Sequence, residues 1–147
     1  MNALTYTEIN DELLHRVEEE MLVTREFLAD WFAGRLDRPK DSQDFYLNRV
    51  LAKNFNTIRP DGTRLDREQT LNGFFEDLHA SEPNVLRHEN LNIRTLSNDG
   101  NIAVIQYDEK HVYTDHDSTN ALTAVFLRND SAPHGVSWLV VHETPVN

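Results

Sequence analysis

The spacing of apolar residues divides the chain into a helical first half and a second half built of strands. Between residues 9 and 32, apolar residues recur about every four positions, which is the period of an α-helix with one buried face. Thr5 with Glu8 suits a capped helix start, and Gly34 suits its end. The acidic run at residues 18–20 lies mostly off the apolar stripe, so we expect a solvated helix face there.

A second helix and a short strand are predicted next. Asp41 or Ser42 opens the helix, whose apolar residues continue through Leu51, and we expect it to end near residues 53–54. The strand covers residues 55–58. The following Pro-Asp-Gly sequence has the order of a type I turn, with proline at its second position.

A capping pattern predicts a third helix. Asp66 precedes Gln69 by three positions, so each side chain can bond the backbone N–H of the other residue. Residues 71–78 then supply an apolar patch, and Pro83 stops the helix.

The remainder of the chain predicts two hairpins. Asp99-Gly100 suits a two-residue type I′ turn, which would place Asn98 opposite Asn101. In the second hairpin, we expect Arg128 to pair with Val136. The four predicted strands cover residues 85–96, 102–113, 122–128 and 136–144.

Helices followed by strands predict an α+β fold, in which a curved antiparallel sheet packs on three N-terminal helices and leaves a conical cavity between the layers. A length of 147 residues suits a single domain over residues 1–147. Residues 102–107 and 136–141 are apolar on both strand faces, which favours a homodimer formed through the sheet.

Charge and composition exclude several classes of function. Twenty-five acidic residues against 14 basic ones give a net charge of −11, which does not suit a nucleic-acid-binding face. The absence of cysteine excludes disulfides and thiolate nucleophiles. The apolar runs are too short to span a bilayer, and the first residues lack the pattern of an export signal, so we expect a cytoplasmic protein.

The first hairpin carries a group of polar side chains. The expected turn would place His88 opposite His111, Asn90 opposite Glu109, and Asn92 opposite Tyr107. Since side chains alternate between the two faces of a strand, these residues and Tyr113 would share one face. This face either lines the cavity or lies outside it, because a slip of one residue reverses the outcome.

The second hairpin carries a mostly apolar group. Its expected register places Leu122, Ala124 and Phe126 on one face with Trp138, Val140 and His142. Core packing accounts for the aromatic residues. His142 is either a buried structural histidine or a base tuned by an apolar cavity.

Three features together resemble the nuclear transport factor 2-like superfamily, in its SnoaL-like and ketosteroid isomerase-like branch of small stand-alone domains. They are the helical first half, the segment 55–62 followed by Arg-Leu-Asp-Arg-Glu at residues 64–68, and the closing strand Trp-Leu-Val-Val-His-Glu-Thr at residues 138–144. The resemblance implies a cystatin-like cone or α+β barrel, a pocket inside it and a homodimer. Members of the superfamily include isomerases, dehydratases, cyclases and association domains, so it implies little about chemistry.

Three functions stay open, and the sequence does not decide whether the protein is an enzyme. The first is a homodimer that binds a small apolar ligand. The second is a cofactor-free isomerase, dehydratase or cyclase with Glu109 or His111 as the base, although no residue matches the family's catalytic aspartate. The third is a protein-association module. The predicted ligand-binding residues are Asn92, Tyr107, Tyr113, Phe126, Trp138 and His142.

Neither a metal site nor a cofactor is predicted. His111, Asp115, His116 and Asp117 are close in sequence, but they lack the paired spacing of known metal motifs, which favours a solvated turn. No glycine-rich phosphate loop is present.

Overall fold

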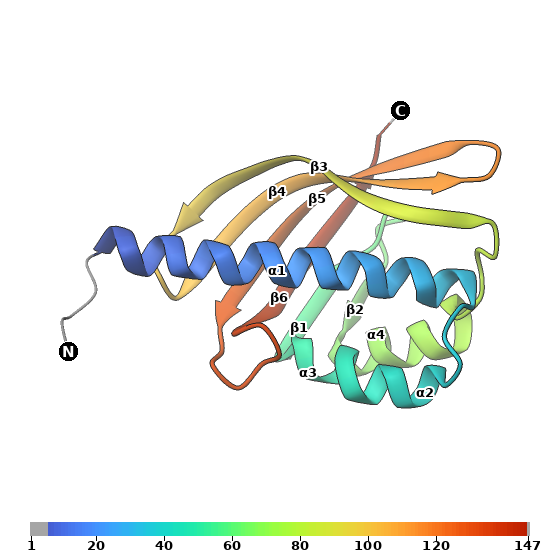
Figure 1. Cartoon of the computed structure of the whole chain (residues 1–147), viewed down its shortest axis with the longest axis horizontal. Coiled ribbons are helices and arrows are strands. Elements are labelled where there is room, and N and C mark those ends of the chain that lie inside the picture. The colour runs from blue at the N-terminus through green and yellow to red at the C-terminus, as the bar shows by residue number, and fades with distance from the viewer. Residues whose placement is uncertain (1–5, 147) are drawn as a thin grey trace.

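The computed structural model describes residues 6–146. Six strands form one curved sheet in the order β2-β1-β6-β5-β4-β3, and the long helix α1 (Tyr6–Ala33) crosses one of its faces (Figure 1). This confirms the predicted α+β architecture. The strands are β1 (Leu51–Ile58), β2 (Arg64–Asp66), β3 (Val85–Asn98), β4 (Ile102–Tyr113), β5 (Asp117–Arg128) and β6 (Val136–Pro145).

Helix α1 follows the predicted period. Leu13, Val17 and Met21 are almost completely buried against the sheet. The helix ends at the predicted glycine: Gly34 has a φ of +72°, and its N–H donates to the carbonyl of Trp31 over 3.2 Å. The predicted capped start at Thr5 lies outside the described residues. None of the helices within residues 6–146 is long and apolar enough to cross a membrane.

The second helical segment differs from its prediction at both ends. It begins with α2 (Pro39–Ser42), continues through a π-helical turn, η1 (Gln43–Leu47), and ends with α3 (Asn48–Val50). It starts at proline, whose fixed φ suits the first helical turn, instead of at Asp41 or Ser42. It ends before the predicted residues 53–54 because Leu51 already pairs with Trp138 of β6.

The third helix begins as predicted. Asp66 Oδ1 accepts from the N–H of Gln69 over 2.8 Å, and Gln69 Oε1 accepts from the N–H of Asp66 over 2.9 Å, which completes the capping box. The helix consists of α4 (Arg67–Gly73) and a second π-helical turn, η2 (Phe74–Leu78). The predicted turn before β2 is closed by a bond of 2.8 Å from the Gly62 N–H to the Arg59 carbonyl.

The sheet departs from a purely antiparallel barrel in two respects. Strand β1 runs parallel to β6, whereas the other four neighbouring pairs are antiparallel. Strands β2 and β3 stand at opposite ends of the strand order and do not pair with each other, so the sheet stays open. The short helices lie beside β1 and β2, away from β3 (Figure 1).

The first hairpin reaches the predicted register by an unexpected route. Asn98 pairs with Ala103, and not with Asn101, because the turn holds four residues. Two of the three irregularities in β3 lie between this turn and His88, and each adds one residue to the strand: one between Leu91 and Arg94, the other between Thr95 and Ser97. Two added residues compensate for the longer turn, so His88 lies opposite His111 as predicted, and Asn90 opposite Glu109.

The buried carboxylate of Glu20 links α1 to the sheet and to η1 through hydrogen bonds. Glu20 has no solvent-exposed surface, so the expectation of a fully solvated face at residues 18–20 was wrong at this position. Its Oε2 accepts from Tyr46 Oη over 2.8 Å, from Trp138 Nε1 over 3.0 Å and from Thr24 Oγ1. Its Oε1 lies 3.2 Å from Nδ1 of His134. These partners supply the hydrogen bonds that a buried carboxylate requires.

Candidate functional site

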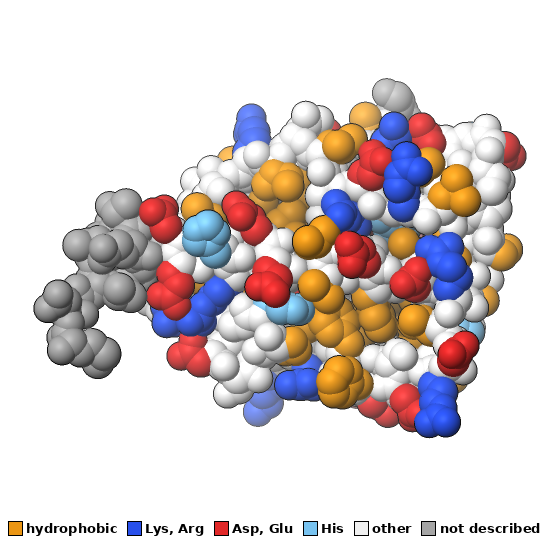
Figure 2. Space-filling model, viewed as in Figure 1, with side chains coloured by type: hydrophobic (Ala, Val, Ile, Leu, Met, Phe, Trp, Pro, Cys, Tyr) orange, Lys and Arg blue, Asp and Glu red, His pale blue; other side chains and the backbone are white. Residues whose placement is uncertain are grey.

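A cavity of about 520 Å³ lies between α1, the shorter helices and the inner face of the sheet. Its walls are mainly apolar and include Leu28 and Phe32 of α1, Phe74 of η2, and Leu122 and Trp138 of the sheet. Figure 2 shows hydrophobic side chains gathered between α1 and the shorter helices on this side of the molecule. The cavity is lined by part of each predicted hairpin face: Tyr107, Glu109 and His111 from the first, and Leu122 and Trp138 from the second.

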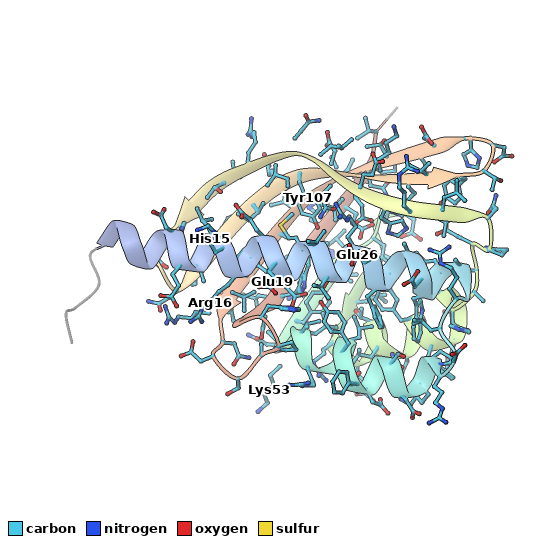
Figure 3. All side chains as sticks on the ribbon, viewed as in Figure 1. His15, Arg16, Glu19, Glu26, Lys53 and Tyr107 are labelled. Atoms are coloured by element: carbon cyan, nitrogen blue, oxygen red, sulfur yellow. The ribbon has the colours of Figure 1, made fainter. Side chains whose placement is uncertain are left out.

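Strand β4 contributes a polar wall to this apolar cavity. Tyr107 (Figure 3), Glu109 and His111 line it because alternate residues of a strand face the same side. Nε2 of His111 lies 2.6 Å from Oε1 of Glu109. The structure therefore brings the two predicted catalytic residues into direct contact at the cavity.

The contact between Glu109 and His111 favours the charged form of both groups. Burial raises the pKa of Glu109, but the hydrogen bond and charge of His111 outweigh it and leave the pKa below its ordinary value. Burial lowers the pKa of His111, and the hydrogen bond and charge of Glu109 outweigh that effect and raise it. The pair is an ion pair shielded from bulk water.

The hydroxyl of Tyr107 and the carboxylate of Glu143 also line the cavity, and neither is hydrogen-bonded to another described residue. Burial raises the pKa of Glu143 to about 7, and the negative charge of Glu109 contributes to the increase. Burial likewise raises the pKa of Tyr107 well above its ordinary value, which keeps its hydroxyl protonated as a donor. A hydrogen-bond donor and a carboxyl group near neutrality are therefore available to a bound molecule.

Glu143 occupies the place that the sequence analysis gave to His142. Arg128 pairs with Val136 as predicted, but β6 contains an extra residue between Trp138 and Val140. From that point side chains exchange faces, so Val140 and His142 were assigned to the wrong side. His142 is exposed, whereas Glu143 lines the cavity.

The other predicted ligand-binding residues fall into different environments. Asn92 is exposed and has a φ of +55°. It lies in the irregularity of β3 between Leu91 and Arg94, and its side-chain amide donates to Oδ2 of Asp108 over 2.8 Å. Phe126 is completely buried in the core against Trp138, with ring centroids 4.3 Å apart. Tyr113 does not line the cavity, but its hydroxyl donates to Glu82, which does. Trp138 and Tyr107 are the two that reach the cavity wall.

The expected solvated turn after β4 is exposed. His116 Nδ1 lies 2.7 Å from Asp115 Oδ1, and both side chains are more than half exposed. His111, by contrast, points away from this turn and into the protein.

Residues that the sequence analysis did not select complete the site. Glu82 follows η2 and directly precedes Pro83, the predicted helix stop, and Arg59 begins the turn before β2; both line the cavity. His88, placed on the polar face but given no role, stacks on His111 with ring centroids 3.8 Å apart and planes at 7°. Burial lowers the pKa of His88 to about 4, helped by the charge of His111. The predicted pairing of His88 with His111 could have indicated that His88 belongs to the site. No sequence pattern marks Glu82.

Comparisons with known proteins identify the fold. No family model matches the sequence, and no curated protein matches it. Among solved structures, a nuclear transport factor 2-like protein of unknown function from Pseudomonas aeruginosa has a TM-score of 0.73 and 22% identity, covering 92% of this chain and 99% of that one. A protein from Novosphingobium aromaticivorans, provisionally named a scytalone dehydratase, has a TM-score of 0.63 and 13% identity, covering 96% and 89%.

The same fold also occurs in a kinase hub. The CaMKII hub of S. rosetta has a TM-score of 0.56 and 15% identity, covering 99% of this chain and 100% of that one. The chain therefore has the nuclear transport factor 2-like fold, as the resemblance implied. At these identities the likeness establishes the fold alone.

The raised pKa of Glu143 predicts how stability depends on pH. Between its ordinary value of 4.5 and about 7, the folded protein keeps a proton on Glu143 that the unfolded chain releases. The free energy of unfolding therefore falls as the pH rises through this range. Glu143→Gln carries no titratable group, so relative to wild type it should gain about 1–2 kcal/mol between about pH 5 and pH 8.

Urea denaturation at the two pH values measures this difference. Glu76→Gln, an exposed site on η2, is the matched control and should follow wild type at both pH values. Parallel pH profiles for Glu143→Gln and wild type would show that Glu143 titrates normally.

Proposed function

We propose that this protein binds a small, largely apolar molecule in its cavity. The cavity itself carries the proposal: a volume of about 520 Å³ with mainly apolar walls falls within the range of roughly 300–1,000 Å³ typical of small-molecule sites. Polar groups interrupt the apolar walls, among them Tyr107, Glu109 and His111 on β4, and such groups fix the orientation of a ligand.

The free polar groups indicate the polar end of the ligand. Tyr107 offers a hydroxyl donor, and Glu143 offers a carboxyl group that accepts or donates according to its protonation. A ligand with a hydroxyl or carbonyl group on an apolar body would satisfy both residues. Steroids, polyketide fragments and aromatic acids represent this class in a thermal-shift screen.

Tyr107→Phe tests the position of the ligand. Removing the hydroxyl should weaken binding of compounds found in the screen by about 5- to 10-fold, because roughly 1 kcal/mol of hydrogen bonding is lost. Tyr113→Phe is the control, since Tyr113 itself does not line the cavity, and it should bind as wild type does. Dissociation constants come from calorimetry. A broad library without any stabilising compound would contradict the proposal, as would equal affinities for Tyr107→Phe and wild type.

The Glu109–His111 pair favours a second candidate function, a cofactor-free acid–base enzyme of the isomerase or dehydratase type. The pair faces the same volume as Glu143 and Tyr107, so a bound molecule would meet carboxylates, an imidazole and a hydroxyl together. Proton transfer at carbon requires such groups to be held against one substrate. The provisional name of the Novosphingobium protein is compatible with this candidate.

Deuterium exchange separates catalysis from binding. The probe is a ketone ligand from the screen, and the measurement is incorporation of solvent deuterium next to its carbonyl, followed by NMR. Glu109→Gln should slow this exchange by about 10²- to 10⁴-fold, as expected for loss of a general base, while leaving ligand binding in place. Exchange at the wild-type rate in Glu109→Gln would exclude a catalytic role for this residue.

We further propose that two copies associate through the sheet. Strands β3 and β4 carry exposed large apolar side chains, including Leu91, Ile93 and Ile102, and such surfaces favour association. Light scattering should give twice the chain mass of 17.1 kDa, and Ile93→Lys should shift the population toward monomer. A mass of 17.1 kDa for wild type would contradict the dimer.

A further inference from the structure

Beside the cavity, one potential ligand atom from each of Glu82, His88 and His111 lies within 4.8 Å of the other two. We propose that these three residues bind a divalent transition-metal ion. Two imidazoles and one carboxylate form a ligand set that suits Zn²⁺, Co²⁺ or Fe²⁺. The inference goes beyond the proposed function, because the ion requires neither a small-molecule ligand nor catalysis.

The state of His88 is the first observation that points to an ion. The residue is only 4% exposed, yet within residues 6–146 neither ring nitrogen has a hydrogen-bond partner. An unsatisfied buried polar group destabilises the folded state, so native proteins rarely keep one without a partner. A metal ion would take one of these nitrogens as a ligand.

Each of the other two ligands has a supporting partner of its own. Glu109 Oε1 lies 2.6 Å from Nε2 of His111, so the other ring nitrogen, Nδ1, is the one available to a metal ion. Binding there would displace the proton that Nδ1 carries while His111 is charged. The Tyr113 hydroxyl donates to one oxygen of Glu82 and leaves the second oxygen available. A carboxylate behind a histidine and a donor behind a carboxylate are the outer partners that orient metal ligands. In this arrangement Glu109 orients His111.

The backbone holds the three residues in place. His88 and His111 are direct partners across β3 and β4. The Glu82 N–H donates to the carbonyl of Phe32 at the end of α1 over 2.8 Å, and the Glu82 carbonyl accepts from the N–H of Val85 over 3.1 Å. Ligands on paired strands and on a doubly anchored loop require little reorganisation of the main chain.

The charges around the cluster favour a cation overall. The negative charges of Glu82, Glu109 and Glu143 favour positive charge at His111, whereas the positive charges of Arg25 and Arg35 disfavour it at His88.

The two imidazole rings require one local adjustment before both can bind the same ion. Their planes lie 7° apart, so their in-plane lone pairs run side by side. A rotation of either ring would make the lone pairs converge on an ion.

No metal site was predicted from the sequence, because the candidate ligands His111, Asp115, His116 and Asp117 were residues close together in the chain. Here the ligands come from the loop after η2, from β3 and from β4, and the strand pairing brings them together. Glu82 also lines the cavity, so an ion at this position would stand at the cavity wall.

Titration of chelator-treated protein with Co²⁺ and then Zn²⁺ tests the proposal. Wild type should bind one Co²⁺ per chain with the visible absorption of a nitrogen-containing site, and Zn²⁺ should displace it and raise the melting temperature. His88→Phe keeps a ring against His111 but removes the ligand. Its affinity should fall by more than the roughly 10- to 100-fold loss seen when an outer partner is removed.

The controls separate this site from the acidic surface and from folding defects. His142→Phe, at an exposed position outside the cluster, should bind Co²⁺ as wild type does. Glu82→Gln removes a second ligand and should also abolish the spectrum, so it decides the result if His88→Phe does not fold. Absence of one-to-one binding in wild type, or wild-type affinity in both His88→Phe and Glu82→Gln, would overturn the proposal.

Discussion

The buried carboxylate of Glu20 is the constraint on which the relation between helix, sheet and cavity depends. It accepts hydrogen bonds from α1 itself, from η1 and from β6, so one side chain fixes three separate segments. A carboxylate without such partners would be expelled toward water, and the donors without the carboxylate would be left unsatisfied. Because Thr24 and Trp138 also line the cavity, the same contacts determine where its wall stands. The cavity is therefore bounded by polar contacts as well as by apolar packing.

Irregularities in the strands determine which polar side chains face the cavity. One extra residue in β6 turns His142 outward and Glu143 inward. Two extra residues in β3 between the turn and His88 offset the two additional residues of the turn, so His88 still pairs with His111. The acidic character of the site, and the contact between the two histidines, both result from these local features.

The sequence was sufficient for the parts of the fold that depend on local patterns. The period of α1, its end at Gly34 and the capping box at Asp66 follow from neighbouring residues. The common face of Tyr107, Glu109 and His111 follows from alternation along β4, whereas the sequence left open whether this face lines the cavity. The face of His142, the end of the second helix at Val50 and the burial of Glu20 depend on contacts with distant segments, which periodicity does not contain. Glu82 joins the site through a loop that carries no pattern.

The buried carboxylate of Glu20 on α1 positions an apolar cavity that has a polar wall. The most direct test of this claim is the free energy of unfolding of Glu20→Ala, measured by urea denaturation beside Glu18→Ala, whose carboxylate is largely exposed. The account predicts a loss of about 3 kcal/mol or more for Glu20→Ala, because three buried donors lose their acceptor. Glu18→Ala should stay within about 0.5 kcal/mol of wild type. An equally small change for Glu20→Ala would contradict the account.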